Sequence, residues 1–249
     1  EIDPKKSLGQ NFVVDPNTVR RIARLSRVGS ESRVVEIGAG LGSLTLALIE
    51  TGAQVTAIET DKALIPILTA LVGDGAQIIH ADVRNLDWDE TLPTPGWTLV
   101  ANLPYNIATS VVLTVLDEVP SIDRMLVMVQ QEAGERLAAA AGDSAYGAVS
   151  VRVALRANSS VVGQVSPSVF YPRPRVSSAL VAIERVNHDI KLDVEAELKE
   201  LLRIAFNQRR KMLRKSLRGR VDEAMFQRQV AEKAALKAKM QALAAEAGF

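Results

Sequence analysis

Short apolar runs alternate along most of the chain with segments whose apolar residues follow helical spacing. The runs are rich in β-branched residues, which is typical of strands buried on both faces of a parallel sheet. We expect seven strands, at residues 33–37, 54–58, 76–80, 97–101, 124–129, 160–165 and 178–186. Helical spacing lies between them at residues 43–51, 62–71 and 109–117. This β-α-β order predicts an α/β fold with a doubly wound, mostly parallel sheet.

The pattern changes near residue 190. The last two expected strands are joined by a loop with three prolines, and from about Leu192 onward the apolar spacing is helical throughout. We therefore expect two domains: residues 1–189, which contain the sheet, and residues 190–249, a small all-helical domain.

Composition narrows the class of protein. With 47% hydrophobic residues the chain can bury a substantial core, and with no cysteine it has no disulfide, thiol catalysis or cysteine-ligated metal centre. Its two histidines, His80 and His188, show no metal-ligand spacing, so we expect no metal. Charged residues interrupt every apolar run before the ~18 to 20 residues that a membrane helix needs. We expect a cytoplasmic monomer.

The net charge of +1 is the sum of an acidic N-terminal part and a basic C-terminal part. Residues 1–189 hold 16 Lys and Arg against 21 Asp and Glu, whereas residues 190–249 hold 14 against 8. Eight basic residues and no acid fall between Arg203 and Arg220. This asymmetry favours a basic surface for a polyanion over a solvated helix, which usually mixes signs. Five of these basic residues follow helix-like spacing and are predicted to contact phosphates: Arg209, Arg210, Lys211, Arg214 and Lys215.

A glycine-rich turn, with Gly38, Gly40 and Gly42, follows the first strand and opens a helix. Glycines there let the backbone approach a ligand closely. Glu59, at the end of the next strand, stands where an acid binds ribose hydroxyls. Asp82 follows the third strand and could accept from the amine of an adenine. Together these residues predict a nucleoside site.

The acid that precedes the turn bears on the choice of nucleoside. NAD sites hold a pyrophosphate at the helix N-terminus, and a carboxylate at Glu36 would repel it. The same carboxylate suits a ligand with a cationic amino acid end. The sequence therefore favours S-adenosylmethionine over NAD.

A second motif, Asn102-Leu103-Pro104-Tyr105, comes directly after the fourth strand. Ligands bind at such strand ends in open α/β sheets. The exocyclic amine of adenine is a poor nucleophile because its lone pair is delocalised into the ring. The Asn102 side-chain oxygen and the carbonyl before Pro104 could both accept from that amine, which would make its nitrogen more nucleophilic. Pro104 would hold the turn rigid, and Tyr105 could stack on the extracted base.

The chain resembles a known family, the KsgA/RsmA ribosomal RNA adenine dimethyltransferases. The resemblance rests on the Asn102 motif, on GQNF at residues 9–12, on FYPRPRVSS at residues 170–178, and on AFNQRRK at residues 205–211. It runs from about Gly9 to Leu217. It implies a Rossmann-like class I methyltransferase fold and methylation of two adjacent adenosines in the 3′-terminal hairpin loop of 16S rRNA. The substrate would be the small ribosomal subunit or its precursor, and the reaction would have a role in ribosome biogenesis.

The resemblance also implies roles for single residues. Phe170 would sandwich the target base from the face opposite Tyr105, and Leu103 would border the amine. Contacts to S-adenosylmethionine would come from the residues that match the family's cofactor site: Asn11, Val13, Gly38, Gly40, Glu59, Asp82 and Asn102.

Three other functions compete with this one. A non-catalytic RNA-binding assembly factor could keep the fold, although it would not need the cofactor residues. A 23S rRNA methyltransferase of the macrolide-resistance type shares the early motifs, but the later two fit the small-subunit enzymes better. A DNA adenine methyltransferase would use the same acceptor chemistry and would have no reason for the later motifs.

Overall fold

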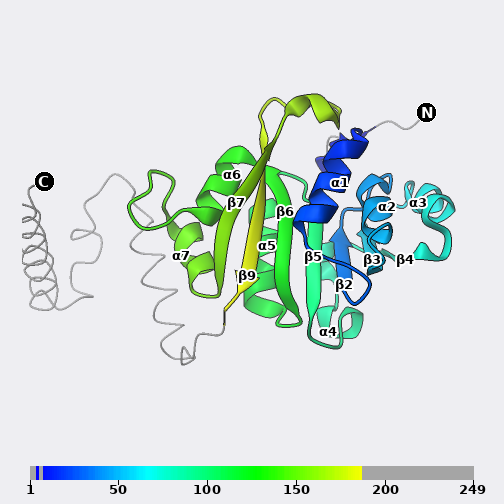
Figure 1. The fold of residues 1–249 in the computed structure, drawn as a ribbon, viewed down its shortest axis with the longest axis horizontal. Helices are drawn as coiled ribbons and strands as arrows, with labels where there is room; N and C mark the ends of the chain where they lie inside the picture. The colour runs from blue at the N-terminus through cyan, green and yellow to red at the C-terminus, as the bar shows by residue number, and fades with distance from the viewer. Residues whose placement is uncertain (1–3, 6–7, 187–249) are drawn as a thin grey trace, which may run out of the picture. The chain divides into compact units, whose positions relative to one another are not determined.

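The computed structural model describes residues 4, 5 and 8–186 (Figure 1). Its strands are β1 (Phe12–Val13), β2 (Arg33–Ile37), β3 (Gln54–Glu59), β4 (Ala76–His80), β5 (Trp97–Asn102), β6 (Ile122–Gln130), β7 (Ala157–Val165), β8 (Phe170–Tyr171) and β9 (Ser178–Arg185). Its α-helices are α1 (Pro16–Leu25), α2 (Ser43–Ile49), α3 (Ile65–Val72), α4 (Trp88–Thr91), α5 (Ala108–Glu118), α6 (Gln131–Ala138) and α7 (Ala148–Ala154).

Within the described residues, seven strands form one sheet in the order β4-β3-β2-β5-β6-β9-β7. The five strands from β4 to β6 pair in parallel, whereas β9 is antiparallel to both β6 and β7. The predicted mostly parallel sheet is thereby confirmed. The strand order reverses between β2 and β5, and such a switch point is where open α/β sheets bind their ligands.

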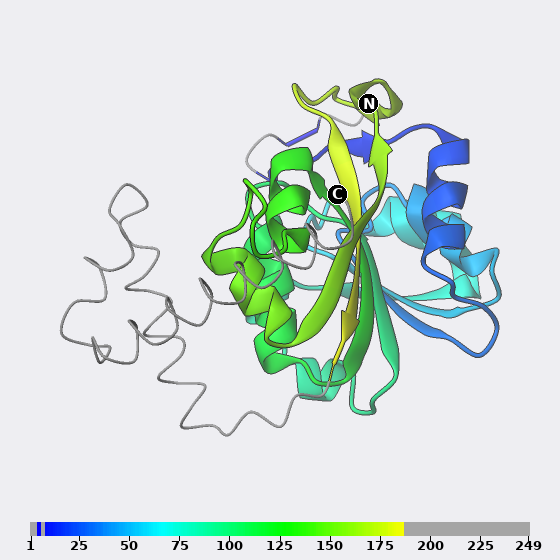
Figure 2. The same ribbon diagram turned by 60° about the vertical axis from the view of Figure 1, so that its left-hand side comes forward.

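Helices cover both faces of the sheet (Figure 2). On one face α1 and α2 pack over Val34, Val100 and Leu126. On the other face α5, α6 and α7 pack over the alternate residues of the same strands, such as Val35 and Leu99. Neighbouring residues of one strand are therefore both buried, which is why the strands read as continuous apolar runs.

Several short elements were not expected from the sequence: β1, β8, α1, α4, α6 and α7. For α1 a local signal exists, because Asp15 accepts a hydrogen bond from Thr18 N as the N-cap and Pro16 occupies the first turn. The helix expected over residues 62–71 begins later, at Ile65, since the Asp61 carboxylate accepts from Ala63 N and holds a turn there.

The predicted C-terminal helical domain, residues 190–249, lies outside the described residues. Its fold, its boundary with residues 1–189 and its basic residues stay predictions.

Candidate functional site

A cleft opens at the carboxyl ends of β2 and β5, where the strand order reverses. Its empty space, including the open mouth, is about 730 Å³. Its walls come from the segment before α1, the glycine turn after β2, the end of β3 and the turn after β5.

Nine of the predicted site residues line this cleft: Asn11, Val13, Gly38, Gly40, Glu59, Asn102, Leu103, Pro104 and Tyr105. Asp82 and Phe170 are not among its lining residues. The five predicted phosphate contacts, residues 209–211, 214 and 215, lie outside the described part of the chain.

The glycine turn has left-handed backbone at alternate positions, with φ of +73° at Gly38, +58° at Gly40 and +80° at Gly42. At Gly40 a Cβ atom would lie 3.0 Å from the ring of Phe12. The backbone N–H of Gly40 donates to Glu59 Oε2 at 2.7 Å. The turn thus requires glycine at residue 40 both for its conformation and for its close approach to two other segments.

Replacement of Gly40 by alanine is expected to weaken cofactor binding about tenfold. The backbone conformation alone costs about 1–2 kcal/mol with a Cβ, and the ring of Phe12 must also move. The matched control is Gly73→Ala, at φ +53° with nothing within 4 Å of the added Cβ. Both variants should lower the melting temperature, and only the Gly40 variant should lower cofactor affinity in a calorimetric titration. Equal affinities would contradict this assignment.

Glu59 is held rigidly at the end of β3. Its Oε1 accepts from Asp61 N at 2.8 Å while its Oε2 accepts from Gly40 N. The side chain is buried and lines the cleft. Because a carboxylate can accept about four hydrogen bonds, Glu59 retains acceptor sites for ribose hydroxyls.

The segment at residues 9–12 forms one wall of the cleft, and each of its residues makes a specific contact there. Gly9 has φ +64°, and its carbonyl accepts from Asn11 Nδ2 at 3.1 Å. The Gln10 amide donates to Asp61 Oδ2 at 3.1 Å, and the ring of Phe12 covers Gly40. The motif GQNF is therefore a strap that closes one side of the site.

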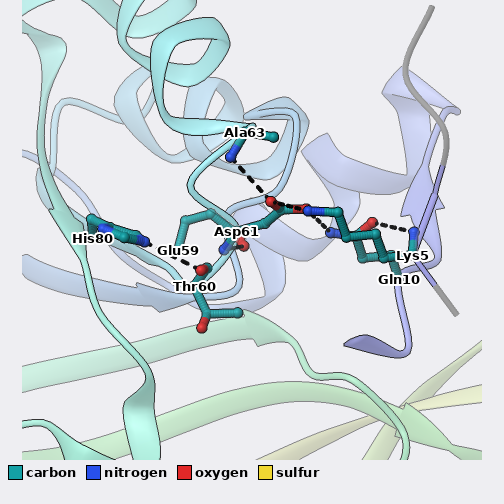
Figure 3. A network of polar contacts seen from close by, with 7 residues as sticks. All are labelled: Lys5, Gln10, Glu59, Thr60, Asp61, Ala63 and His80. Atoms are coloured by element: carbon teal, nitrogen blue, oxygen red, sulfur yellow. Dashed lines mark hydrogen bonds and ion pairs between the residues drawn. The ribbon is translucent and has the colours of Figure 1, made fainter. Parts of the chain in front are cut away.

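Asp61 anchors this strap to the end of β3 (Figure 3). Its Oδ1 accepts from Lys5 Nζ at 2.7 Å and from Ala63 N at 3.0 Å. The hydrogen bonds from Lys5 and Gln10 join the N-terminal segment to the end of β3. These hydrogen bonds, that from Lys5 above all, hold the pKa of the Asp61 carboxyl below its usual range. Sequence reasoning missed Asp61. The available signal was an acid two residues beyond Glu59 on the same strand end.

Glu36 is a buried carboxyl in the wall of the cleft. Its Oε2 has no hydrogen-bond partner among the described residues. Burial, reinforced by the charge of Glu59, raises the pKa of Glu36 from 4.5 to about 8. Burial therefore favours the protonated carboxyl near neutral pH. Its charge depends on a cation reaching it.

Asn102 is oriented by the strap. Its Nδ2 donates to the carbonyl oxygen of Asn11 at 2.8 Å, which fixes the amide so that Oδ1 points the other way. Neither Asn102 Oδ1 nor the carbonyl oxygen of Leu103 accepts a hydrogen bond from another described residue. Two acceptors on successive residues thus stand unused at the edge of the cleft.

Tyr105 is held at the cleft from a distant part of the chain. Its hydroxyl lies 2.8 Å from Ser178 Oγ, and Ser178 is fully buried at the start of β9. Burial raises the pKa of the Tyr105 hydroxyl, so the ring stays neutral. The final serine of the segment at residues 170–178 therefore serves to fix the Tyr105 ring.

The two predicted residues outside the cleft wall have other contacts. The Asp82 carboxylate binds the Arg84 guanidinium, with 2.6 Å between Oδ2 and Nη2, and this hydrogen bond lowers its pKa. Phe170 is 4% exposed and packs in the core with Val13 and Val165. In this structure neither side chain reaches the cleft.

Two further features concern only the part of the chain that the structure describes. In it no three His, Cys, Asp or Glu side chains are grouped so as to hold a metal ion. Nor does any of its helices combine the length and apolar character needed to cross a membrane.

The amino-acid sequence matches the family model described as ribosomal RNA adenine dimethylase over residues 3–247. Two similar relatives are each named ribosomal RNA small subunit methyltransferase A. The relative from Streptomyces coelicolor is 44% identical over 227 residues, which cover 88% of this chain and 78% of the relative. The relative from Thermobifida fusca is 46% identical over 224 residues, which cover 87% and 77%.

Two solved structures share the fold at lower identity. A dimethyladenosine transferase from Plasmodium falciparum superposes with a TM-score of 0.70 at 24% identity, over 91% of this chain and 82% of the other. The 23S rRNA methyltransferase ErmE superposes with a TM-score of 0.69 at 24% identity, over 83% of each chain. The predicted class I methyltransferase fold is thereby confirmed.

Proposed function

The chain belongs to the ribosomal RNA adenine dimethylase family, and on this premise we propose that it transfers methyl groups from S-adenosylmethionine to two adjacent adenosines. The target amines are the N6 atoms in the 3′-terminal hairpin loop of 16S rRNA, in the small subunit or its precursor. The protein acts in the cytoplasm, as a monomer, and serves ribosome biogenesis. The observation that carries the proposal is the pair of unused acceptors at Asn102 and Leu103, beside a buried carboxyl that lacks a partner.

The residues of the cleft fit this methyl donor, which supplies an electrophilic methyl group on a sulfonium when bound. Glu36 Oε2 provides the partner that its ammonium group needs. Glu59 keeps acceptor sites for the ribose hydroxyls. Gly38 and Gly40 leave room for close approach, and Asn11 and Val13 complete the wall. Asp82 would bind the adenine amine only if its carboxylate turned from Arg84 or accepted a further bond.

Asn102 and Leu103 activate the N6 amine that receives the methyl group. Asn102 Oδ1 and the Leu103 carbonyl oxygen each accept a hydrogen bond from the N6 amine. When both N–H groups donate to these oxygens, the nitrogen lone pair is less delocalised into the ring. The nitrogen therefore becomes more nucleophilic. The alkylated amine is acidic, so its proton is lost to water and no side chain needs to act as a strong base. The Asn102–Asn11 bond keeps the acceptor in position beforehand.

Tyr105 stacks on the target base once that base has turned out of the hairpin loop. Its hydroxyl bond to Ser178 fixes the plane of the ring.

RNA affinity is assigned to the basic residues of the C-terminal part, which lie outside the described residues. Arg210→Glu with Lys211→Glu is expected to weaken RNA binding and to flatten its salt dependence. Losing two phosphate contacts should lower the slope of log K against log salt by about 1.5. The control is Arg136→Glu on α6, a surface residue away from the cleft. An unchanged slope in the double variant would refute the phosphate assignment.

The proposal is tested with small subunits from a strain that lacks the modification. The protein and labelled S-adenosylmethionine should give dimethyladenosine at two adjacent positions near the 3′ end of 16S rRNA, mapped by primer extension. Methylation of 23S rRNA or of duplex DNA instead would identify one of the competing methyltransferases. Tight binding of subunits with no cofactor binding in calorimetry would identify a non-catalytic assembly factor.

A further inference from the structure

The loop segment at residues 171–177 leads from β8 to β9, and at each of its ends a residue is paired with or hydrogen-bonded to a residue that lines the cleft. At its start, β8 pairs with β1, which places Tyr171 directly opposite Phe12, a residue of the cleft wall. At its end, Ser178 binds the hydroxyl of Tyr105, another residue of the wall. The backbone N–H of Gln131 donates to the Ser177 carbonyl at 3.0 Å. Both ends of this loop, here named the lip, are therefore fixed to the active site.

The pairing of β1 with β8 sorts four side chains onto two faces. Directly paired residues point to the same face, and successive residues to opposite faces. Val13 and Phe170 form one pair and are both buried, at 6% and 4% exposure. Phe12 and Tyr171 form the other pair, on the face where the Phe12 ring covers Gly40; Phe12 and Val13 both line the cleft. Tyr171 is 61% exposed, so its ring is the aromatic surface of this pair that an arriving strand meets.

The rest of the lip suits a nucleic acid. Arg173 and Arg175 are exposed, and neither forms an ion pair with another described residue. Val176 is 46% exposed. An exposed aromatic ring that pairs with a residue of the cleft wall, followed two and four residues later by exposed arginines, combines the two elements that single-stranded RNA requires, a stacking surface and phosphate contacts.

We propose that the lip binds the substrate strand beside the target adenosine, with Tyr171 stacked on the base of the adjacent nucleotide and Arg173 and Arg175 on its phosphates. The inference rests on the proposed function. While one of the two adjacent adenosines occupies the cleft, its neighbour stands outside, where the Tyr171 ring is.

The test measures methylation kinetics on unmodified small subunits. Tyr171→Ala should raise the KM for subunits about tenfold, because loss of one aromatic stack weakens RNA binding by about that factor. It should leave the Kd for S-adenosylmethionine and the melting temperature near wild type. Tyr171→Phe keeps the ring and should restore the KM. A Tyr171→Ala variant with wild-type KM, or a Tyr171→Phe variant as weak as the alanine variant, would overturn the stacking role.

The arginines are tested separately through salt. Arg173→Gln with Arg175→Gln should make log KM less sensitive to log salt, with a slope smaller by about 1.4 for two single-strand contacts. Arg136→Gln should leave the slope unchanged, and an unchanged slope in the double variant would overturn the phosphate contacts. A wild-type protein that methylates no small-subunit adenosine would instead refute the proposed function. That failure is visible before any variant is measured.

Discussion

Asn102→Ala is expected to lower the rate of methyl transfer by about 10²- to 10³-fold, the loss found when a preorganised polar group is removed from a reaction centre. The variant loses Oδ1, one of two acceptors for the N6 amine, so the nitrogen lone pair stays delocalised in the ring. Single-turnover transfer to unmodified small subunits, with saturating cofactor, measures this step directly. Undiminished turnover would remove Asn102 from the reaction.

Asn102 has a second role that the experiment must separate from the first. Its Nδ2 donates to the Asn11 carbonyl at 2.8 Å and so helps to hold the strap at residues 9–12. Asn102→Asp keeps an acceptor and loses that donor. If orientation by the strap is the larger effect, the transfer rate of the aspartate variant should be nearly as low as that of the alanine variant. Cofactor affinity, measured by calorimetry, should change little in both.

Glu36→Gln is expected to weaken binding of S-adenosylmethionine about ten- to hundredfold, because the ligand's ammonium loses a charged hydrogen-bond partner. In the wild type the buried carboxyl, with a pKa of about 8, must release a proton when it meets that ammonium. Below pH 8 the wild-type affinity should therefore rise with pH, and the affinity of the glutamine variant should stay flat. Calorimetry at pH 7 in two buffers with different ionisation enthalpies measures the released proton. Binding without proton release would contradict the assignment.

The same carboxyl makes folding stability depend on pH in the opposite direction. Between pH 4.5, its ordinary pKa, and about pH 8, the folded chain keeps a proton that the unfolded chain releases. Its contribution to stability is therefore fully present below pH 4.5 and is lost as pH rises through 8, by up to about 1.4 kcal/mol per pH unit. Urea unfolding at pH 5, 7 and 9 should show a flatter dependence for Glu36→Gln. Parallel slopes would mean that Glu36 is ionised in the folded chain.

Much of the sheet could be predicted because its central strands are buried on both faces. The bounds of β2 agree with the sequence prediction, since four of its five residues are buried and a glycine turn follows it. The bounds of β4 also agree, although this strand lies at the edge of the sheet and exposes Gln77 and His80. The strands β1 and β8 were missed because two-residue strands are too short to show a period. With them the sequence missed the burial of Phe170, which only their pairing reveals.

In the candidate site, too, local features could be predicted from the sequence and long-range contacts could not. Residues that belong to one turn, such as Gly38, Gly40 and the segment at residues 102–105, could be found from local sequence. The ties of Lys5 and Gln10 to Asp61 join residues more than 50 positions apart and leave no local pattern. The raised pKa of Glu36 could not be predicted, because it depends on how deeply the folded chain buries that carboxyl.

The groups that position the reactive amine have a consequence for inhibitor design. One acceptor is the main-chain carbonyl of Leu103, and the amide of Asn102 is held by the main-chain carbonyl of Asn11. A point mutation replaces a side chain and leaves these carbonyls in place. A compound that binds them would therefore be evaded by few single substitutions, and those that move the main chain would damage the enzyme itself.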